Sequence, residues 1–205
     1  MKIIEDLTQN SPEWLDARKG KITGSKLKDI VVKRGTGKKL GFYELMADRL
    51  AIDTGEEDSM ERGHALESEA LDLLQETLKK PIERGLFCVS DKNPDIALSP
   101  DGLIKNDGKY TEAVEVKCLS TARHLQAYFE QEIPDDYYLQ VIQYFIVNED
   151  LETLYLTFYD PRVTIKPIHF IIVKRETITE DIATYEKYQE ETLKEINDLL
   201  TNLAF

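Results

Sequence analysis

Two carboxylates and a lysine lie within one short stretch, residues 99–119, and are the side chains best suited to chemistry. The Asn-Asp-Gly sequence at 106–108 is a strong turn signal, so the stretch predicts a β-hairpin. Asp101, just inside the first arm, and Glu115, in the second arm, lie about equally far from this turn. An antiparallel register therefore places them roughly opposite each other, within about 5 Å. Two facing carboxylates repel unless one is protonated or a cation lies between them.

The second arm, residues 112–118, alternates in polarity, and the alternation decides which side chains share a face. Val114 and Val116 fall on one face, whereas Glu115 and Lys117 share the other. Carboxylate oxygens suit Mg²⁺ or Mn²⁺ rather than zinc, and a nearby lysine lowers the cost of forming hydroxide. The pattern indicates metal-dependent phosphodiester hydrolysis, in which two ions can bind the attacking and leaving oxygens. A type I turn followed by a polar strand face is the plainer interpretation.

The charge of the chain is unevenly distributed. The whole sequence has a formal net charge of −13, which is unusual for a nucleic-acid-binding protein. Residues 18–39, however, contain nine lysines and arginines and a single acidic residue, Asp29. A basic segment on an acidic body suits a protein that holds phosphates in one place. A solvated basic helix and loop is the alternative interpretation.

The basic segment contains a candidate phosphate site. A helix is predicted over about 25–32, and the Thr-Gly-Ser sequence at 23–25 lies at its start. Backbone N–H groups and small hydroxyl side chains at a helix start can hold a phosphate. Arg18 close by would add a bidentate phosphate contact, so Arg18 and Ser25 are candidate phosphate ligands. Simple helix capping by Thr23 or Ser25 is the alternative.

A helix predicted over about 61–79 precedes the hairpin and carries Glu67. Its apolar stripe consists of Leu66, Ala70, Leu73 and Leu74. On its own, Glu67 is typical of an exposed helix residue. His64 lies nearly one turn before Glu67, and we assign it no role. Pro81 ends the helix.

The remaining pattern predicts a succession of strands and helices. Strands are expected at 84–90, 95–104, 112–118, 152–159 and 167–174, and helices at 11–18, 42–52, 121–131 and 136–147. The first three strands would form an antiparallel meander that carries the hairpin. A long helix is expected from residue 179 onward, and its apolar stripe predicts that it packs on the body.

Polar residues with candidate roles also lie in the second half of the chain. On the helix over 136–147, Gln140 shares a face with Gln143 or Tyr144, and this face could hydrogen-bond a phosphate near the metal edge. An ordinary polar helix face is the alternative. Arg162 follows an Asp-Pro turn and could pair with Asp160, with a phosphate or with a neighbouring subunit.

Size and composition restrict the class of protein. With 205 residues, 41 % of them hydrophobic, the chain is expected to form one domain, or one domain with an appended helix, with a sizeable core. We expect a cytoplasmic protein without a membrane segment, because no apolar run approaches spanning length and the N-terminus lacks a secretory h-region. Cys88 and Cys118 are expected to be reduced core residues, and two cysteines cannot build a four-cysteine iron–sulfur or zinc site.

The order helix, three antiparallel strands, helix, strand, with Asp101 and Glu115-Val116-Lys117 on strands two and three, resembles the PD-(D/E)xK nuclease superfamily. The chain is more closely similar to the phage lambda exonuclease type, also called YqaJ-type viral recombinases. Elements of that type occur in order over nearly the whole chain: Trp14 … Arg18, Ile22-Thr23-Gly24-Ser25, Gly63 … Glu67, Ser99-Pro100-Asp101-Gly102, Glu115-Val116-Lys117-Cys118, Gln140-Val141 and Tyr159-Asp160-Pro161-Arg162. An isolated D…ExK pattern recurs by chance, whereas the ordered motifs around it make the resemblance specific.

The resemblance implies a fold and an activity. The fold would be mixed α/β, with a restriction-endonuclease-like core in which helices flank a central mixed sheet. One nuclease domain would span 1–205, with a basic helical region at 11–52, a catalytic core at 61–175 and a C-terminal helix at 179–203. Members of the family degrade one strand of duplex DNA processively from a 5′ end with Mg²⁺, for which Mn²⁺ can substitute. They form ring-shaped trimers and work beside a single-strand annealing protein in recombination.

The resemblance also implies roles for individual residues. The metal ions would be held by three carboxylates and one backbone carbonyl, those of Glu67, Asp101, Glu115 and Val116. The 5′ phosphate and the DNA would be bound by Arg18, Ser25, Ser99, Gln140 and Gln143. Lys117 would position the attacking water and help to deprotonate it.

One departure from the family pattern bears on these roles. Ile142 stands where a glutamine is common, so that Gln143 or Tyr144 would take that part. Two other functions also stay open: an endonuclease or structure-specific nuclease on the same fold, and a non-catalytic DNA-binding or assembly protein. The intact set of Asp101, Glu115 and Lys117 argues against a non-catalytic protein. The lack of a visible recognition domain argues against a sequence-specific endonuclease.

Overall fold

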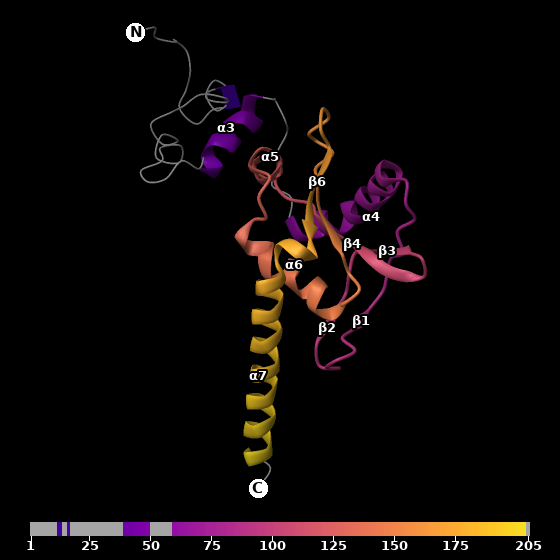
Figure 1. Cartoon of the computed structure of the whole chain (residues 1–205). Helices are drawn as coiled ribbons and strands as arrows, with labels where there is room; N and C mark the ends of the chain where they lie inside the picture. Colours follow the sequence, from indigo (N-terminus) through magenta and orange to yellow (C-terminus); the bar gives the residue numbers. More distant parts are fainter. Residues whose placement is uncertain (1–11, 14–15, 17–38, 50–58, 204–205) are drawn as a thin grey trace.

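The computed structural model describes residues 12–13, 16, 39–49 and 59–203 (Figure 1). Most of the predicted helix over 11–18, the helix over 25–32, Arg18 and Ser25 lie outside these ranges. The first long described helices are α3 (Leu40–Arg49) and α4 (Ser59–Leu78), close to the expected helices over 42–52 and 61–79.

A four-stranded mixed sheet lies at the centre of the described structure. Its strands are β3 (Gly102–Asn106), β4 (Lys109–Lys117), β5 (Thr153–Tyr159) and β6 (Ile168–Lys174), in that order. β3 and β4 pair antiparallel, β4 and β5 parallel, and β5 and β6 antiparallel. Parallel neighbours need a long crossover, and α5 (Thr121–Glu130) and α6 (Asp135–Val147) supply it. A mixed sheet flanked by helices confirms the predicted fold class.

Each face of the sheet carries its own hydrophobic core. Val114 and Val116 of β4 pack with Leu71 and Leu74 of α4 on one face. Ala113 on the other face packs with residues of α6, and α7 (Thr179–Leu203) joins the same core. The alternation along β4 expected from the sequence is therefore confirmed, and it places Glu115 and Lys117 on the α6 face.

The hairpin between β3 and β4 has the turn that its sequence predicts. Asn106 pairs with Lys109 across a two-residue loop. Asp107 and Gly108 both have positive φ, 48° and 86°, as a type I′ turn requires. The turn sets the register only of the residues next to it, because the pairing shifts by one residue between Ile104 and Lys105. This irregularity in the ladder is what pairs Gly102 with Val114 and so leaves Asp101 opposite Glu115.

The predicted strands before the hairpin are the main correction. The expected strand at 84–90 reduces to the two-residue strand β1 (Cys88–Val89), and the expected strand at 95–104 divides into the two-residue strand β2 (Ala97–Leu98) and the start of β3. β1 and β2 pair with each other in a sheet of their own. A continuous strand over 95–104 is wrong because Pro100 lacks the N–H that a ladder needs. Asp101 consequently lies directly before β3 rather than inside it. The expected antiparallel meander is present in interrupted form: β1 pairs antiparallel with β2, β3 pairs antiparallel with β4, and an isolated antiparallel bridge joins Glu83 to Leu103. It is wrong as a continuous three-stranded sheet, because β1 and β2 form a sheet of their own.

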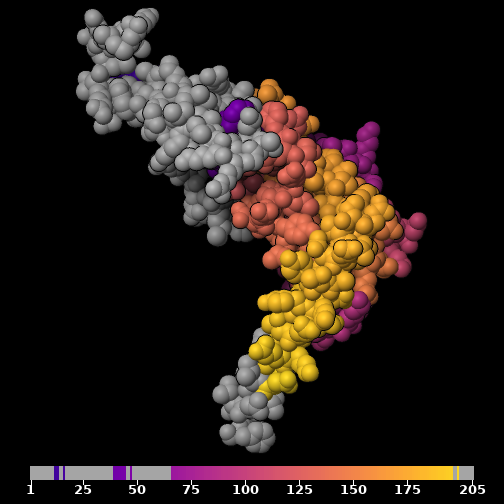
Figure 2. All heavy atoms as spheres, turned by 60° about the vertical axis from the view of Figure 1, so that its left-hand side comes forward, coloured from indigo at the N-terminus to yellow at the C-terminus, as the bar shows by residue number. Residues whose placement is uncertain are grey.

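The C-terminal helix packs on the body over its first part. Ile182 is buried, and Tyr185 and Leu193 are partly buried against the core under α6. Figure 1 shows the rest of α7 projecting beyond the body, and Figure 2 shows the yellow part of α7 leading away from the body. The predicted packing of the C-terminal helix on the body is therefore confirmed for the first part of α7. Within the described residues, none of the helices has the length and apolar character that crossing a membrane requires.

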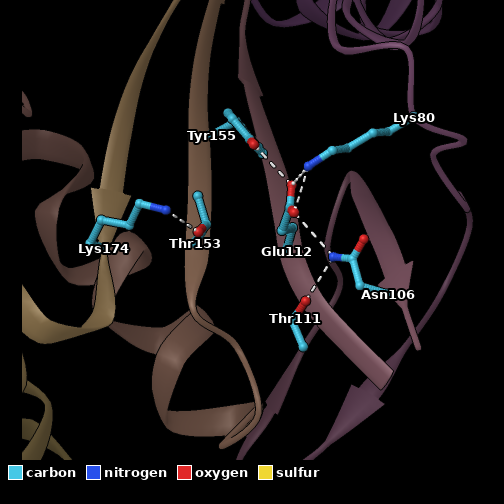
Figure 3. Close-up of polar contacts among 7 residues, drawn as sticks. All are labelled: Lys80, Asn106, Thr111, Glu112, Thr153, Tyr155 and Lys174. Carbon is cyan, nitrogen blue, oxygen red and sulfur yellow. Dashed lines mark hydrogen bonds and ion pairs between the residues drawn. The ribbon is translucent and has the colours of Figure 1, made fainter. Parts of the chain in front are cut away.

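A polar network tethers the segment that follows α4 to the sheet (Figure 3). Lys80 Nζ lies 2.6 and 2.8 Å from the two carboxylate oxygens of Glu112 on β4. The Tyr155 hydroxyl and the Asn106 side-chain amide donate to the same carboxylate at 2.9 and 3.0 Å. Burial acts to raise the pKa of Glu112, but the bonds from Lys80 and Tyr155 outweigh it and lower that pKa overall. By strand alternation, Glu112 lies on the opposite face of β4 from Glu115.

Candidate active site

The hairpin register brings Asp101 and Glu115 together. Gly102 pairs with Val114, so the next residue outward on each arm is Asp101 on one and Glu115 on the other. Asp101 Oδ2 accepts a hydrogen bond of 2.7 Å from the backbone N–H of Val116, which anchors its carboxylate against β4. The facing arrangement expected from the distance to the turn is confirmed.

Glu115 is a buried carboxylate with three polar partners. Its side chain is almost inaccessible, with a residue exposure of 3 %. Lys117 Nζ and Gln140 Nε2 both lie 2.7 Å from Oε1, and the Tyr144 hydroxyl lies 2.5 Å from Oε2. These bonds offset the cost of burying a charge, because each carboxylate oxygen has at least one donor.

One face of α6 holds the lysine as well as the carboxylate. Gln140 Oε1 accepts a 2.9 Å bond from Lys117 Nζ, so a single amide side chain bridges Lys117 and Glu115. The Lys117 ammonium also lies 4.7 Å from the centre of the Tyr137 ring, within range of a cation–π interaction. Tyr137, Gln140 and Tyr144 are three and four residues apart, the spacing that aligns side chains along one helix face.

The electrostatics of the pair favour a cation. Burial, followed by repulsion from Glu115 and Glu67, raises the pKa of Asp101 from 3.8 to about 7, although the Val116 N–H bond acts in the opposite direction. Burial and the charges of Glu115 and Asp101 also raise the pKa of the Tyr144 phenol, which therefore stays a proton donor at neutral pH. A divalent cation between the carboxylates would relieve their repulsion.

Glu67 and Ser99 reach the same region from other elements. With Asp101 they line an open pocket of about 590 Å³, whose wall also includes Arg84 and Phe87. Glu67 comes from α4 and is partly buried, whereas Ser99 lies in the irregular segment after β2 and is exposed. The pocket therefore gives solvent access to the side of Asp101 that faces Glu67.

The donor set fits a hard divalent cation in type and in charge. Asp101, Glu115 and Glu67 offer carboxylate oxygens, and Val116 offers a backbone carbonyl, the ligands that Mg²⁺ and Mn²⁺ prefer. Among the described residues, no three acidic, histidine or cysteine side chains are close enough to form a ready-made cage. Asp101 and Glu115 would therefore be the main ligands of a cation held here, and Glu67 would add a third carboxylate from the side of the pocket.

Sequence comparison identifies the family. The model of the YqaJ-like viral recombinase domain matches residues 13–152, which include Glu67, Asp101, Glu115, Lys117 and Gln140. The chain belongs to the YqaJ-like viral recombinase family. No curated protein matches the chain significantly.

Solved structures agree with this fold. The chain is similar to the alkaline exonuclease LHK-Exo from Laribacter hongkongensis, with a TM-score of 0.61, 21 % identity, and coverage of 95 % of this chain and 98 % of the exonuclease. The structure of LHK-Exo in complex with dAMP gives a TM-score of 0.60 and 22 % identity over the same shares of the two chains. At this identity the similarity establishes the fold, and residue roles rest on the site itself.

Not every predicted site residue of this YqaJ-like chain joins the cluster. Gln143 donates to the Ala97 carbonyl at 3.2 Å and accepts from Gln189 of α7 at 2.8 Å, so it lies away from Lys117 and Glu115. Of the two alternatives for the second polar residue of α6, the structure brings Tyr144 to the carboxylates. Arg18 and Ser25 lie outside the described residues, so their roles stay predictions.

Tyr137 is the site residue that sequence reasoning missed. A tyrosine three residues before Gln140 shares its helix face, and this spacing was the available signal.

Arg162 pairs with Asp160, the first of the partners predicted for it. Its Nε lies 2.9 Å from Oδ1 of the buried Asp160.

Proposed function

We propose that this protein is a Mg²⁺-dependent exonuclease that degrades one strand of duplex DNA processively, 5′ to 3′, from an end. The observation that carries the proposal is the buried cluster in which Asp101 faces Glu115 and Lys117 lies 2.7 Å from the Glu115 carboxylate. Membership of the YqaJ-like viral recombinase family supports a role on DNA. The similar fold of an alkaline exonuclease, determined also with dAMP, supports nuclease chemistry.

The residues divide the chemistry among them. Asp101, Glu115, Glu67 and the Val116 carbonyl would hold Mg²⁺, with Mn²⁺ as a substitute. The bound cation would neutralise charge on the phosphate and lower the pKa of water. Lys117 lies beside the Glu115 carboxylate, where its ammonium group would orient the attacking water and lower the cost of forming hydroxide. Gln140 holds both of these side chains and would contact the substrate next to the scissile phosphate.

Recognition of the DNA end belongs to a second set of residues. Ser99 lies exposed on the pocket that Asp101 and Glu67 also line, which suits a hydroxyl that contacts a terminal phosphate. Arg18 and Ser25 are proposed to complete this 5′-phosphate site, on the strength of their motifs. Removal of one strand from its 5′ end would expose a 3′ single strand for a single-strand annealing protein. A homotrimeric ring and action in the cytoplasm belong to the same proposal.

Digestion of matched DNA substrates tests the proposal. Linear duplex with 5′ phosphates should be degraded to mononucleotides and a single strand in Mg²⁺, and chelation by EDTA should stop the reaction. Covalently closed circles of the same sequence should be spared. Cleavage of closed circles would instead show an endonuclease, and binding without cleavage of either substrate would show a non-catalytic DNA-binding protein.

A further inference from the structure

The Tyr144 hydroxyl contacts groups from both arms of the hairpin. It lies 3.3 Å from the backbone nitrogen of Asp101, 3.2 Å from the Val114 carbonyl oxygen and 2.5 Å from Glu115 Oε2. Asp101 belongs to the segment that leads into β3, whereas Val114 and Glu115 belong to β4. One phenol oxygen thus joins the two residues whose carboxylates face each other.

The single proton of the phenol fixes the direction of these bonds. The Asp101 N–H has only a proton to give, so the hydroxyl oxygen accepts from it. The hydroxyl then donates its own proton to Glu115, the nearer acceptor and the charged one, and the Val114 carbonyl is a more distant second acceptor. A hydrogen bond to an ionised carboxylate is shorter and stronger than one between neutral groups.

The Glu115 carboxylate is consequently held at both of its oxygens. Tyr144 donates to Oε2, while Lys117 and Gln140 donate to Oε1. Tyr144 is 1 % exposed, so water has little access to replace its hydroxyl. Donors of this kind fix the orientation of a metal ligand, and their loss typically costs about 10–100-fold in metal affinity or activity.

We propose that Tyr144 is a positioning residue for the divalent cation. Its hydroxyl fixes the Glu115 carboxylate and the Asp101 backbone in the relative orientation that lets the two side chains share one ion. This inference rests on the proposed function, because it assumes that Asp101 and Glu115 hold the cation.

The chain offers a matched control for removal of one tyrosine hydroxyl. Tyr155 also donates to a carboxylate, that of Glu112, at 2.9 Å (Figure 3). Glu112 lies on the opposite face of β4 from Glu115 and is already paired with Lys80. Tyr155→Phe therefore removes the same chemical group and a similar bond without touching the candidate site.

Mn²⁺ binding to the full-length protein without DNA, measured by calorimetry or electron paramagnetic resonance, tests the inference. We expect Tyr144→Phe to weaken Mn²⁺ binding by about tenfold or more and Tyr155→Phe to leave it within about twofold of the wild type. Wild-type affinity in Tyr144→Phe would overturn the inference, and so would an equal loss in both variants.

A second measurement does not depend on the folding of Tyr144→Phe. 3-Fluorotyrosine introduced at position 144 or 155 keeps the ring and the hydroxyl and gives a ¹⁹F signal. In a Mg²⁺ titration, the signal from position 144 should shift over the concentrations that support cleavage, while the signal from position 155 stays fixed. A signal from position 144 that stays fixed at saturating Mg²⁺ would overturn the inference.

Glu115→Gln separates failure of this inference from failure of the proposed function. Loss of Mn²⁺ binding in Glu115→Gln together with wild-type binding in Tyr144→Phe would overturn only the role of Tyr144. Wild-type Mn²⁺ binding in Glu115→Gln would overturn the metal site itself, and with it the inference.

Discussion

Asp101 and Glu115 face each other across the end of the β3–β4 hairpin, and burial together with their mutual repulsion raises the pKa of Asp101 to about 7. The folded protein therefore holds the Asp101 proton more tightly than the unfolded chain does, where the pKa is 3.8. The stabilising contribution is complete below about pH 4 and is lost as the pH rises toward 7.

Asp101→Asn should remove this pH-dependent loss. The amide oxygen can still accept from the Val116 N–H, so the fold keeps that bond. In EDTA at pH 8, we expect the variant to exceed the wild type in free energy of unfolding by roughly 1–3 kcal/mol, allowing for partial solvation, and by less at pH 4.5. Mg²⁺ should stabilise the wild type at pH 8 and leave the variant unchanged. Urea unfolding at both pH values, with and without Mg²⁺, measures this, and parallel pH curves for the two proteins would contradict it.

Lys117→Ala should abolish cleavage while leaving DNA binding largely intact. Loss of a general acid–base group typically costs about 10²–10⁴-fold in rate, so we expect a fall of at least about 100-fold in Mg²⁺-dependent digestion of linear duplex. Lys109→Ala is the matched control, because Lys109 forms an exposed ion pair with Asp150 at the far end of β4. Circular dichroism checks folding, and full activity in Lys117→Ala would exclude the proposed role.

His169 should also make the free energy of unfolding depend on pH, with a sign opposite to that of Asp101. Burial and the neighbouring His124 lower its pKa from 6.5 to about 4, and its Nε2 lies 3.1 Å from the His124 carbonyl oxygen. Its contribution to stability is therefore complete above about pH 6.5 and is lost as the pH falls toward 4. His169→Gln keeps an N–H donor but does not titrate, so its free energy of unfolding should fall less between pH 7.5 and 5 than that of the wild type. Equal falls in the two proteins would exclude this role.

The local pattern of the hairpin was sufficient to predict the core of the site. The Asn-Asp-Gly turn predicted the hairpin, and the alternation along residues 112–118 predicted the faces, because both signals come from residues close together in sequence. The position of Asp101 opposite Glu115 also depends on the one-residue register shift between Ile104 and Lys105. The break at Pro100 was also readable from its missing N–H, yet the apolar residues around it favoured a continuous strand. The break is what leaves Asp101 just outside β3.

Contacts between distant elements could not be predicted in the same way. Helical spacing showed that Gln140 shares a face with Gln143 or Tyr144, but it could not decide between them. The choice depends on how α6 is rotated against the sheet, and on α7, whose Gln189 binds Gln143. Equally, the charge of Glu67 gave no sign that it reaches the Asp101 pocket, because that approach depends on how α4 packs against Val114 and Val116.

Preference for a 5′ phosphate should depend on Ser99 and Arg18. Removing a hydrogen-bond donor to a charged phosphate costs about 1.5–3 kcal/mol, so we expect the rate ratio between phosphorylated and hydroxyl ends to fall about 10-fold or more in Ser99→Ala and Arg18→Ala. Ser68→Ala is the control, because Ser68 lines the same pocket without a predicted role. Mn²⁺ binding should stay unchanged in all three variants. Equal rates on the two kinds of end in the wild type would exclude the assignment.

Gly102 tests how tightly α4 and its following segment are packed against the hairpin beside Asp101. A Cβ at this position would lie 2.3 Å from Cγ2 of Ile82, a separation that forces the two segments apart. Overpacking of this kind typically costs about 1–3 kcal/mol, and we expect Gly102→Ala to lower the free energy of unfolding by that amount. Ile82→Ala removes the clashing methyl group at its own cavity cost, so the double variant should be more stable than the sum of the two single losses predicts. Urea unfolding of the four proteins measures the coupling, and strict additivity would show that the hairpin can shift away from Ile82.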